Sequence, residues 1–185
     1  ELPGERWTRT GLKDDGRPFD WRERFGREAP RIVDLGCGNG RFLIGSALAR
    51  PGHDHLGMDQ IQRTVDWASQ RANRRGLTNV CFTTGEAWTW LSGRLAASSV
   101  DELHVYHPQP YYSPQEASRR LITPAFLSRA REVLKPGGLL ILQTDSQAYW
   151  RYLRAAVPFH FEPELHRDPW PDAPRGRTRR EILAR

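Results

Sequence analysis

Short apolar runs along this chain alternate with longer stretches in which apolar residues recur at helical spacing. The short runs predict β-strands at residues 32–35, 55–58, 79–83, 100–106 and 139–144. The longer stretches predict helices at about residues 40–49, 61–75, 86–92, 123–134 and 146–155. Because strands that alternate with helices form a parallel sheet with right-handed crossovers, we expect an α/β fold with helices on both faces of a mostly parallel central sheet.

Two local signals place the boundaries of the helix expected at 123–134. Thr123 is suited to cap its N-terminus, and Pro124 is suited to the first helical position. The sequence Lys-Pro-Gly-Gly at residues 135–138 is expected to end that helix and turn the chain into the next strand.

The first 29 residues mix Gly, Pro, Trp and charged residues without a clear period. We therefore expect a poorly ordered N-terminal arm at residues 1–29, followed by one domain at residues 30–185. A chain of 185 residues is long enough for one covered sheet and too short for a second full domain.

The charge of the chain is dominated by arginine. There are 28 basic and 22 acidic residues, which gives a net charge of +6, and only Lys13 and Lys135 are lysines. Since arginine binds phosphate in a bidentate manner, this composition favours a polyanionic partner. A solvated basic surface without such a partner is the alternative reading of the same charges.

The two cysteines, Cys37 and Cys81, lie in separate apolar runs and lack the paired spacing of zinc or redox sites. We expect them to be buried thiols and expect no metal site. The sequence shows neither an apolar run of about twenty residues nor a charged and then apolar leader. These features favour a cytoplasmic protein that does not interact with a membrane.

The first strand is followed by the most informative motif, a turn in which glycines occupy alternate positions. Asp34 ends the apolar run, and Gly36, Gly38 and Gly40 follow it. Glycine lets the backbone approach a ligand closely at a turn from strand to helix. The third glycine comes too early for the dinucleotide fingerprint, and the spacing suits a nucleoside without a pyrophosphate.

Two further strands also end in an acid. Asp59 follows the second run, at the place where Rossmann-like folds hold a ribose diol through a carboxylate. Glu86 follows the third run. Either acid alone suits a solvated loop, but in this order after a glycine-rich turn they indicate one nucleoside site.

This constellation resembles that of the class I methyltransferases that use S-adenosylmethionine. The resemblance implies that the turn wraps the methionine part of this donor and that Asp34 contacts its amino group. It also implies that Asp59 holds the ribose and that Glu86 lies beside the adenine. The donor-binding residues implied in this way are Asp34, Gly36, Gly38, Asn39, Gly40, Asp59, Glu86 and Ala87.

Residues 34–181 resemble more narrowly the bacterial tRNA (guanine-N7)-methyltransferase family, whose loop usually reads Phe-Pro-Asp-Pro-Trp-Pro-Lys. The frame of that loop matches at 108–111, and further matches are Arg-Arg-Leu from residue 119, Thr-Asp at 144–145 and Thr-Arg-Arg-Glu at 178–181. The resemblance implies methyl transfer from S-adenosylmethionine to guanine N7, with tRNA as the partner. Paired tyrosines in the loop are suited to stack on a base. The expected substrate-binding residues are Tyr111, Ser113, Asp145, Thr178, Arg179, Arg180 and Glu181.

The loop also departs from the family. Gln109 replaces the carboxylate, and Ser113 replaces the usual lysine. Guanine N7 carries a lone pair and no proton, so its methylation requires positioning more than a general base. Gln109 is therefore the expected catalytic residue in place of the family carboxylate, and it is also expected among the donor-binding residues, because its amide can orient the base or the donor. The arginines expected to contact RNA phosphates are Arg119, Arg120, Arg175, Arg177, Arg179 and Arg180.

Two other functions remain open on the sequence. One keeps the donor site and transfers methyl groups to a small molecule or an exocyclic amine. The other is a non-catalytic RNA-binding protein that lost activity with the loop carboxylate.

Overall fold

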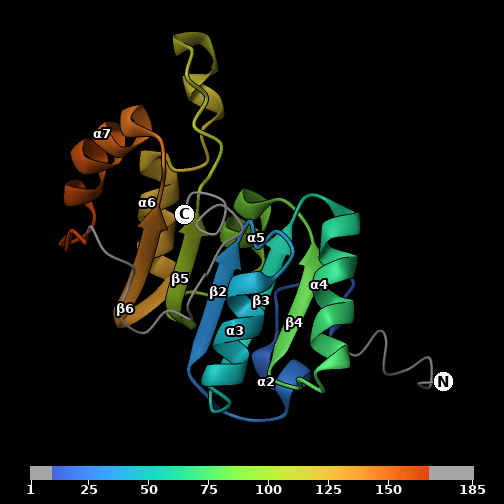
Figure 1. Ribbon diagram of the computed structural model, residues 1–185. Coiled ribbons are helices and arrows are strands. Elements are labelled where there is room, and N and C mark those ends of the chain that lie inside the picture. The colour runs from blue at the N-terminus through green and yellow to red at the C-terminus, as the bar shows by residue number, and fades with distance from the viewer. Residues whose placement is uncertain (1–9, 167–185) are drawn as a thin grey trace.

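The computed structural model describes residues 10–166, which form one six-stranded sheet with helices on both sides (Figure 1). Every pair of neighbouring strands in this part of the chain is parallel. The strands are β1 (Gly11–Leu12), β2 (Arg31–Leu35), β3 (Asp54–Asp59), β4 (Val80–Thr84), β5 (Val100–Tyr106) and β6 (Leu134–Gln143). The helices are α2 (Trp21–Phe25), α3 (Arg41–Ala49), α4 (Gln62–Arg74), α5 (Ala87–Gly93), α6 (Pro124–Val133) and α7 (Gln147–Ala156), with 3-10 helices η1 (Pro114–Arg119) and η2 (Val157–Phe159).

In the strand order β1-β4-β3-β2-β5-β6, strand β2 lies in the interior of the sheet, between β3 and β5. From β2 the chain first builds outward through β3 and β4, and then crosses to the opposite side for β5 and β6. The order therefore reverses between β2 and β5. In open α/β sheets, ligands bind outside the carboxyl ends of the strands at such a reversal.

Two hydrophobic clusters cover the two faces of the sheet. One contains the buried side chains of α3 and α4, and the other contains those of α2, α5, α6 and α7. Strand β2 contributes to both, since Ile32 lies in the first cluster while Val33 and Leu35 lie in the second. A strand buried on both faces needs apolar residues at successive positions, which explains the continuous run seen in the sequence.

The predicted α/β class is confirmed, and each predicted strand and helix has a counterpart within a few residues. The cap of α6 is also as predicted, because the Thr123 side chain accepts a hydrogen bond from the Phe126 N–H. Both cysteines are buried free thiols, as expected.

The Lys-Pro-Gly-Gly turn differs from its prediction, because residues 135–138 lie inside β6 instead of before it. The register passes from Val100 opposite Leu134 to Glu102 opposite Leu139, so these four residues form an irregularity opposite Asp101. Lys135 Nζ lies 2.7 Å from Asp101 Oδ2, which fixes the turn against β5.

The prediction of little structure before residue 30 was wrong for residues 10–29. Strand β1 pairs with β4, and α2 is capped by the Asp20 side chain, which accepts from the Glu23 N–H. Trp21 is buried and packs edge-on against Phe19, with 4.9 Å between the ring centroids. These short elements are held by packing on the core, which a periodicity search does not detect.

The segment between β5 and α6, residues 107–123, projects beyond the carboxyl edge of the sheet and carries η1 (Figure 1). Among residues 10–166, no helix has both the length and the apolar composition that crossing a bilayer requires.

Candidate functional site

The glycine turn between β2 and α3 adopts a backbone that other residues rarely take. Gly36, Gly38 and Gly40 all have positive φ, at 87°, 53° and 69°. A Cβ at Gly40 would lie 2.7 Å from Ala68 Cβ and 2.8 Å from the Phe82 ring, so packing requires glycine there. A Cβ at Gly36 or Gly38 would meet nothing within 4 Å. The first two glycines thus leave open space beside the backbone.

Asp34 is a buried carboxylate one residue before the end of β2, with 2% of its surface exposed. Within the described part of the chain its Oδ1 has no hydrogen-bond partner. Burial, together with the nearby charge of Asp59, raises its pKa to about 8. A buried carboxyl with an oxygen that lacks a partner is costly, and a cation delivered beside it would stabilise the ionised form.

Asp59 joins the ends of three neighbouring strands. Its Oδ2 accepts from the Gly38 N–H at 3.0 Å, and its Oδ1 accepts from the Ile61 N–H at 3.0 Å. Its backbone carbonyl accepts from the Gly85 N–H at 3.0 Å. The glycine turn, the end of β3 and the end of β4 are therefore held together by Asp59.

Glu86 and Ala87 lie at the start of α5, directly after this junction. Glu86 is exposed, precedes the helix, and accepts from Thr89 Oγ1 at 2.9 Å through Oε2. Two exposed apolar residues accompany them: Ile61 is 62% exposed, and Trp88 is 38% exposed. The sequence interpretation did not include either one, although an apolar residue soon after a strand-end acid is a visible signal. Exposed apolar surface of this kind is suited to bind a flat ring.

Below the end of β5, three polar side chains form a ladder on the face that carries α3. Tyr106 Oη lies 2.8 Å from His104 Nδ1, and His104 Nε2 lies 2.9 Å from Glu102 Oε2. Arg50 Nη1 donates to Glu102 Oε1 at 2.8 Å. Burial alone raises the pKa of Glu102, but the contacts with His104 and Arg50 outweigh it and lower the pKa to about 2. The ladder fixes Tyr106 at the carboxyl edge.

The loop after Tyr106 is held by Arg120. Its Nε donates to the Pro110 carbonyl at 2.8 Å, and its Nη2 donates to the Tyr111 carbonyl at 3.1 Å. The same guanidinium lies over the rings of Tyr149 and Tyr152, at 5.4 and 5.3 Å. Arg120 is therefore engaged in holding the loop, and its predicted contact with phosphate stays a prediction. No local sequence pattern indicates these partners of Arg120.

The other loop residues are oriented in different ways. Gln109 and Tyr112 are exposed, whereas Arg119 lies 4.9 Å from the Tyr111 ring centre. Ser113 caps η1, where its Oγ donates to Glu116 Oε2 at 2.9 Å. Gln109 is thus exposed on the loop, while Ser113 already has a structural role.

Asp145 lies at the end of β6, next to the loop that follows β5. Its Oδ1 is 3.6 Å from His107 Nδ1, and its side chain is 56% exposed. The sequence interpretation did not include His107. The expected substrate residues Thr178, Arg179, Arg180 and Glu181, and the arginines Arg175 and Arg177, lie outside the described residues.

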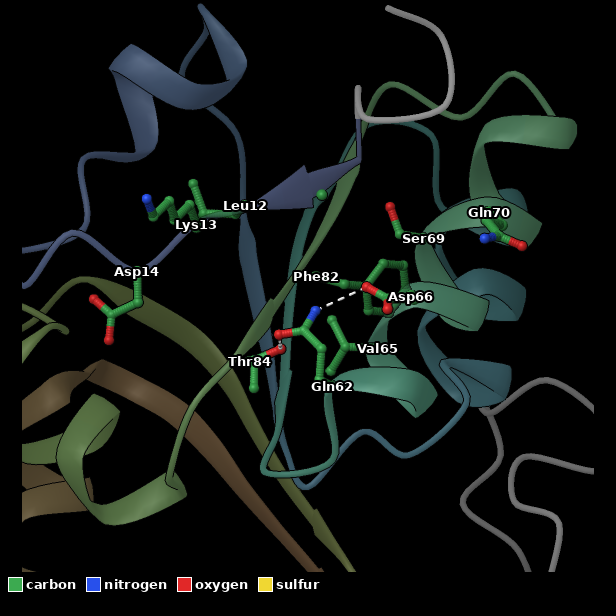
Figure 2. A pocket seen from close by; sticks show the side chains of 11 residues that line it. Leu12, Lys13, Asp14, Gln62, Val65, Asp66, Ser69, Gln70, Phe82 and Thr84 are labelled. Carbon is green, nitrogen blue, oxygen red and sulfur yellow. Dashed lines mark hydrogen bonds between the residues drawn. The ribbon is translucent and has the colours of Figure 1, made fainter. Parts of the chain in front are cut away.

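A cavity of about 640 Å³ lies apart from these residues, between β1, β4 and α4 (Figure 2). Gln62 crosses one end of it, accepting from Thr84 Oγ1 and donating to Asp66 Oδ1, both at 2.8 Å. None of the predicted site residues lines it. Its lining is Gly11, Leu12, Lys13, Asp14, Gln62, Val65, Asp66, Ser69, Gln70, Phe82 and Thr84.

Comparison with solved structures supports the fold. The antibiotic-resistance methyltransferase Kmr has a TM-score of 0.54 at 24% identity, covering 76% of this chain and 75% of that one. A 30S ribosomal A1408 methyltransferase from an uncultured bacterium has a TM-score of 0.53 at 21% identity, covering 72% and 67%. At these identities the likeness concerns the fold alone.

Curated relatives carry the name tRNA (guanine-N(7)-)-methyltransferase. That of Nitrosococcus oceani is 32% identical over 83% of this chain and 65% of its own length. Those of Nocardia farcinica and Burkholderia vietnamiensis are 32% and 36% identical, over 80% and 70% of this chain and 55% and 51% of their own. The chain thus spans about half to two thirds of the length of these relatives.

A protein family described as "Putative methyltransferase" matches residues 28–180, which include the glycine turn, the strand-end acids and the loop after β5. The match and the named relatives confirm the resemblance found in the motifs. The chain belongs to this methyltransferase family.

Proposed function

We propose that this chain transfers a methyl group from S-adenosylmethionine to N7 of a guanine in tRNA. The observation that carries the proposal is Asp34, a carboxylate that is 2% exposed with one oxygen unpartnered within residues 10–166. It lies directly before a turn whose first two glycines face open space. A cationic amino group on a ligand at this turn supplies the partner that Asp34 lacks.

The residues present fit the rest of the donor as well. Asp59 accepts from the glycine turn and lies at the end of β3, which suits a carboxylate that binds a ribose diol. Ile61 and Trp88 offer exposed apolar surface near Glu86 for the adenine. Gly36, Gly38, Asn39 and Gly40 bind the methionine part in this proposal, and Ala87 lies with the adenine.

S-adenosylmethionine supplies a methyl group on a positively charged sulfur when it is bound. The protein then has to hold the nucleophilic nitrogen in line with that methyl group, at roughly 3 Å. Because N7 has no proton to remove, no general base is required. In this proposal Gln109 orients the base or the donor through its amide, which its exposed place on the loop allows.

The tRNA acceptor is proposed from the named relatives and from the residues around the loop. Tyr111 and Asp145 lie on the two segments that follow β5 and β6, and they are suited to stack on a base and to accept from its N–H groups. Ser113, Thr178, Arg179, Arg180 and Glu181 complete the proposed substrate-binding set. We further propose that residues 30–185, together with the strand and helix at residues 10–29, act as one domain and that the protein works in the cytoplasm on tRNA.

The test is incubation of unmodified host tRNA with labelled S-adenosylmethionine, followed by mass spectrometry of the nucleosides. The expected product is 7-methylguanosine. Label on an exocyclic amine, or on metabolites and never on tRNA, would overturn the proposed acceptor while keeping the donor. RNA binding without any donor binding at millimolar concentration would identify a non-catalytic RNA-binding protein.

A matched substrate makes this test specific for the atom that is methylated. A transcript in which guanosine is replaced by 7-deazaguanosine retains the Watson–Crick edge but has no N7 lone pair. We expect it to bind and to accept no methyl group. Methylation of this transcript would show that another atom is the acceptor.

A further inference from the structure

His107 takes a backbone conformation that is unusual for its residue type. It is the first residue after β5, and its φ is +50°. Its N–H donates to the Gln143 carbonyl at 2.8 Å, which continues the β5–β6 pairing one step past Tyr106. A left-handed backbone at a bulky residue costs free energy and tends to persist at functional sites.

This conformation brings the ring to Asp145. The side chain of His107 is 9% exposed, and its Nδ1 is 3.6 Å from Asp145 Oδ1. Contacts of this length in a site without substrate often shorten when the substrate binds. One oxygen of a half-exposed carboxylate is thus directed toward an enclosed imidazole.

The backbone around Asp145 is fixed on both sides. Before it, Gln143, the last residue of β6, pairs with Tyr106 of β5. After it, the Ser146 N–H donates to Thr144 Oγ1 at 3.1 Å, and Ser146 caps α7 by accepting from the Tyr149 N–H. The remaining freedom of Asp145 is therefore mainly the rotation of its side chain, which is the freedom that His107 restricts.

We propose that His107 is a positioning residue that holds Asp145 for recognition of the acceptor base. This inference rests on the proposed function. The imidazole contacts Oδ1, and the carboxylate held in this orientation accepts from N–H groups on the edge of the guanine. A carboxylate held in this way loses less conformational entropy on binding than one that rotates freely.

The role separates His107 from the residues that bind the donor. The imidazole acts through Asp145 and not on the methyl group. Its loss should therefore raise the KM for tRNA and leave both the donor affinity and kcat nearly unchanged. A residue that served only the packing of the loop would instead change stability, and its loss would not depend on the presence of Asp145.

A double-mutant cycle tests this directly, using steady-state methylation of unmodified tRNA. The variants are His107→Phe, which keeps an aromatic ring without nitrogens, Asp145→Asn, and the pair together. We expect His107→Phe to raise the KM for tRNA about tenfold in the wild-type background, and less than about twofold when Asp145 is already Asn. Independent effects of the two substitutions would overturn the proposal.

A conservative variant controls for the strained backbone. Asparagine accepts a left-handed φ more readily and keeps an N–H donor, so His107→Asn should stay within about threefold of the wild-type KM. Thermal unfolding and donor titration of each variant report folding and the donor site. If His107→Phe does not fold, His107→Asn and His107→Gly form the comparison, and equal KM values for these two would refute the role.

The outcomes separate this inference from the proposed function. If the wild-type protein places no methyl group on tRNA guanine, the proposed function itself fails. If it does methylate guanine and the cycle shows no coupling, only the role of His107 fails.

Discussion

The backbone N–H of Gly38 donates to Asp59 Oδ2 at 3.0 Å, which joins the glycine turn to the end of the neighbouring strand. The same carboxylate accepts from Ile61, so it orders two loops. In the proposed function it also binds the ribose of the donor. Asp59 therefore contributes both to the structure of the two loops and to the affinity for the donor. Substitutions of Asp59 can separate these two contributions.

Asp59→Ala should weaken S-adenosylmethionine binding by about a hundredfold or more, because two charge-assisted hydrogen bonds of about 1.5–3 kcal/mol each are lost. Isothermal titration measures this affinity. Asp59→Asn, which keeps one oxygen acceptor, should fall between the wild type and the alanine variant. An unchanged affinity in Asp59→Ala would refute the ribose assignment.

Asp34→Asn should stabilise the ligand-free protein and weaken donor binding by about tenfold to a hundredfold. It removes a buried acid that has an unpartnered oxygen, and it also removes the charge that pairs with the amino group of the donor. Thermal unfolding and donor titration on the same samples should therefore move in opposite directions. A variant that loses stability would contradict the assignment of Asp34 as a buried carboxyl with an unpartnered oxygen.

The stability gain in Asp34→Asn should depend on pH in a defined direction. The ordinary pKa of this carboxyl is 3.8, and burial raises it to about 8 in the folded state. Between these values the unfolded chain has released a proton that the folded chain keeps, so the wild-type free energy of unfolding falls as pH rises. The advantage of Asn should thus be absent below about pH 4, grow up to about pH 8 and then stay constant.

Three glycine substitutions should separate packing from ligand approach. Gly40→Ala should cost about 2–5 kcal/mol, since its Cβ clashes with Ala68 and Phe82 and its φ is positive. Gly38→Ala should cost about 1–2 kcal/mol and weaken donor binding, because its Cβ enters the open space beside the turn. Gly26→Ala has a similar φ with nothing nearby and lies in the cap of α2, so it should leave donor affinity unchanged. Denaturant unfolding and titration distinguish the three patterns.

Arg120→Ala and Arg119→Ala should differ in their effects on thermal stability and on tRNA binding. Arg120 donates to two loop carbonyls and lies over two tyrosine rings, so its loss should lower Tm by about 5–10 °C. Arg119 is largely exposed and should change Tm by about 1 °C or less. If Arg119 contacts RNA phosphate, its alanine variant should instead weaken tRNA binding and reduce the salt dependence of that binding. Equal effects of both variants on Tm would contradict this division.

Gln109→Asp should preserve or raise the methylation of tRNA if the loop works as it does in the related family. The side chain is exposed, so the change should leave the unfolding temperature nearly unaltered. Initial rates on unmodified tRNA, with donor affinity as the control, measure the effect. A severe loss of rate with intact donor binding would show that the amide serves a different chemistry.

The strands and the acids at their ends could be predicted because their signals are local. Buried parallel strands require apolar runs, and Gly36 to Gly40 mark a turn that few other residues permit. The carboxyl ends of parallel strands meet at one edge, so Asp34 and Asp59 were expected to lie near each other. The strand register agrees with this, because Asp34 pairs with Gly57, two residues before Asp59, and Asp59 accepts from the N–H of Gly38 in the turn that follows Asp34.

The parts that sequence reasoning missed depend on contacts that no local pattern records. His107 and Tyr111 have positive φ without being glycine, and no propensity indicates this. Arg120 resembles any basic loop residue until its carbonyl and tyrosine partners are known. Strand β1 has two residues, and α2 has five, which is too short for a helical period to emerge.

Strand β1 also has a consequence for the solubility of the chain. Gly11 and Leu12 pair with Phe82 and Thr83, and the Phe82 N–H donates to the Thr10 carbonyl at 2.8 Å. Without them, the outer side of β4 would present unpaired backbone groups on which another chain can add. Shortening the protein past residue 12 should therefore promote self-association through β4, even though no residue of the glycine turn is removed.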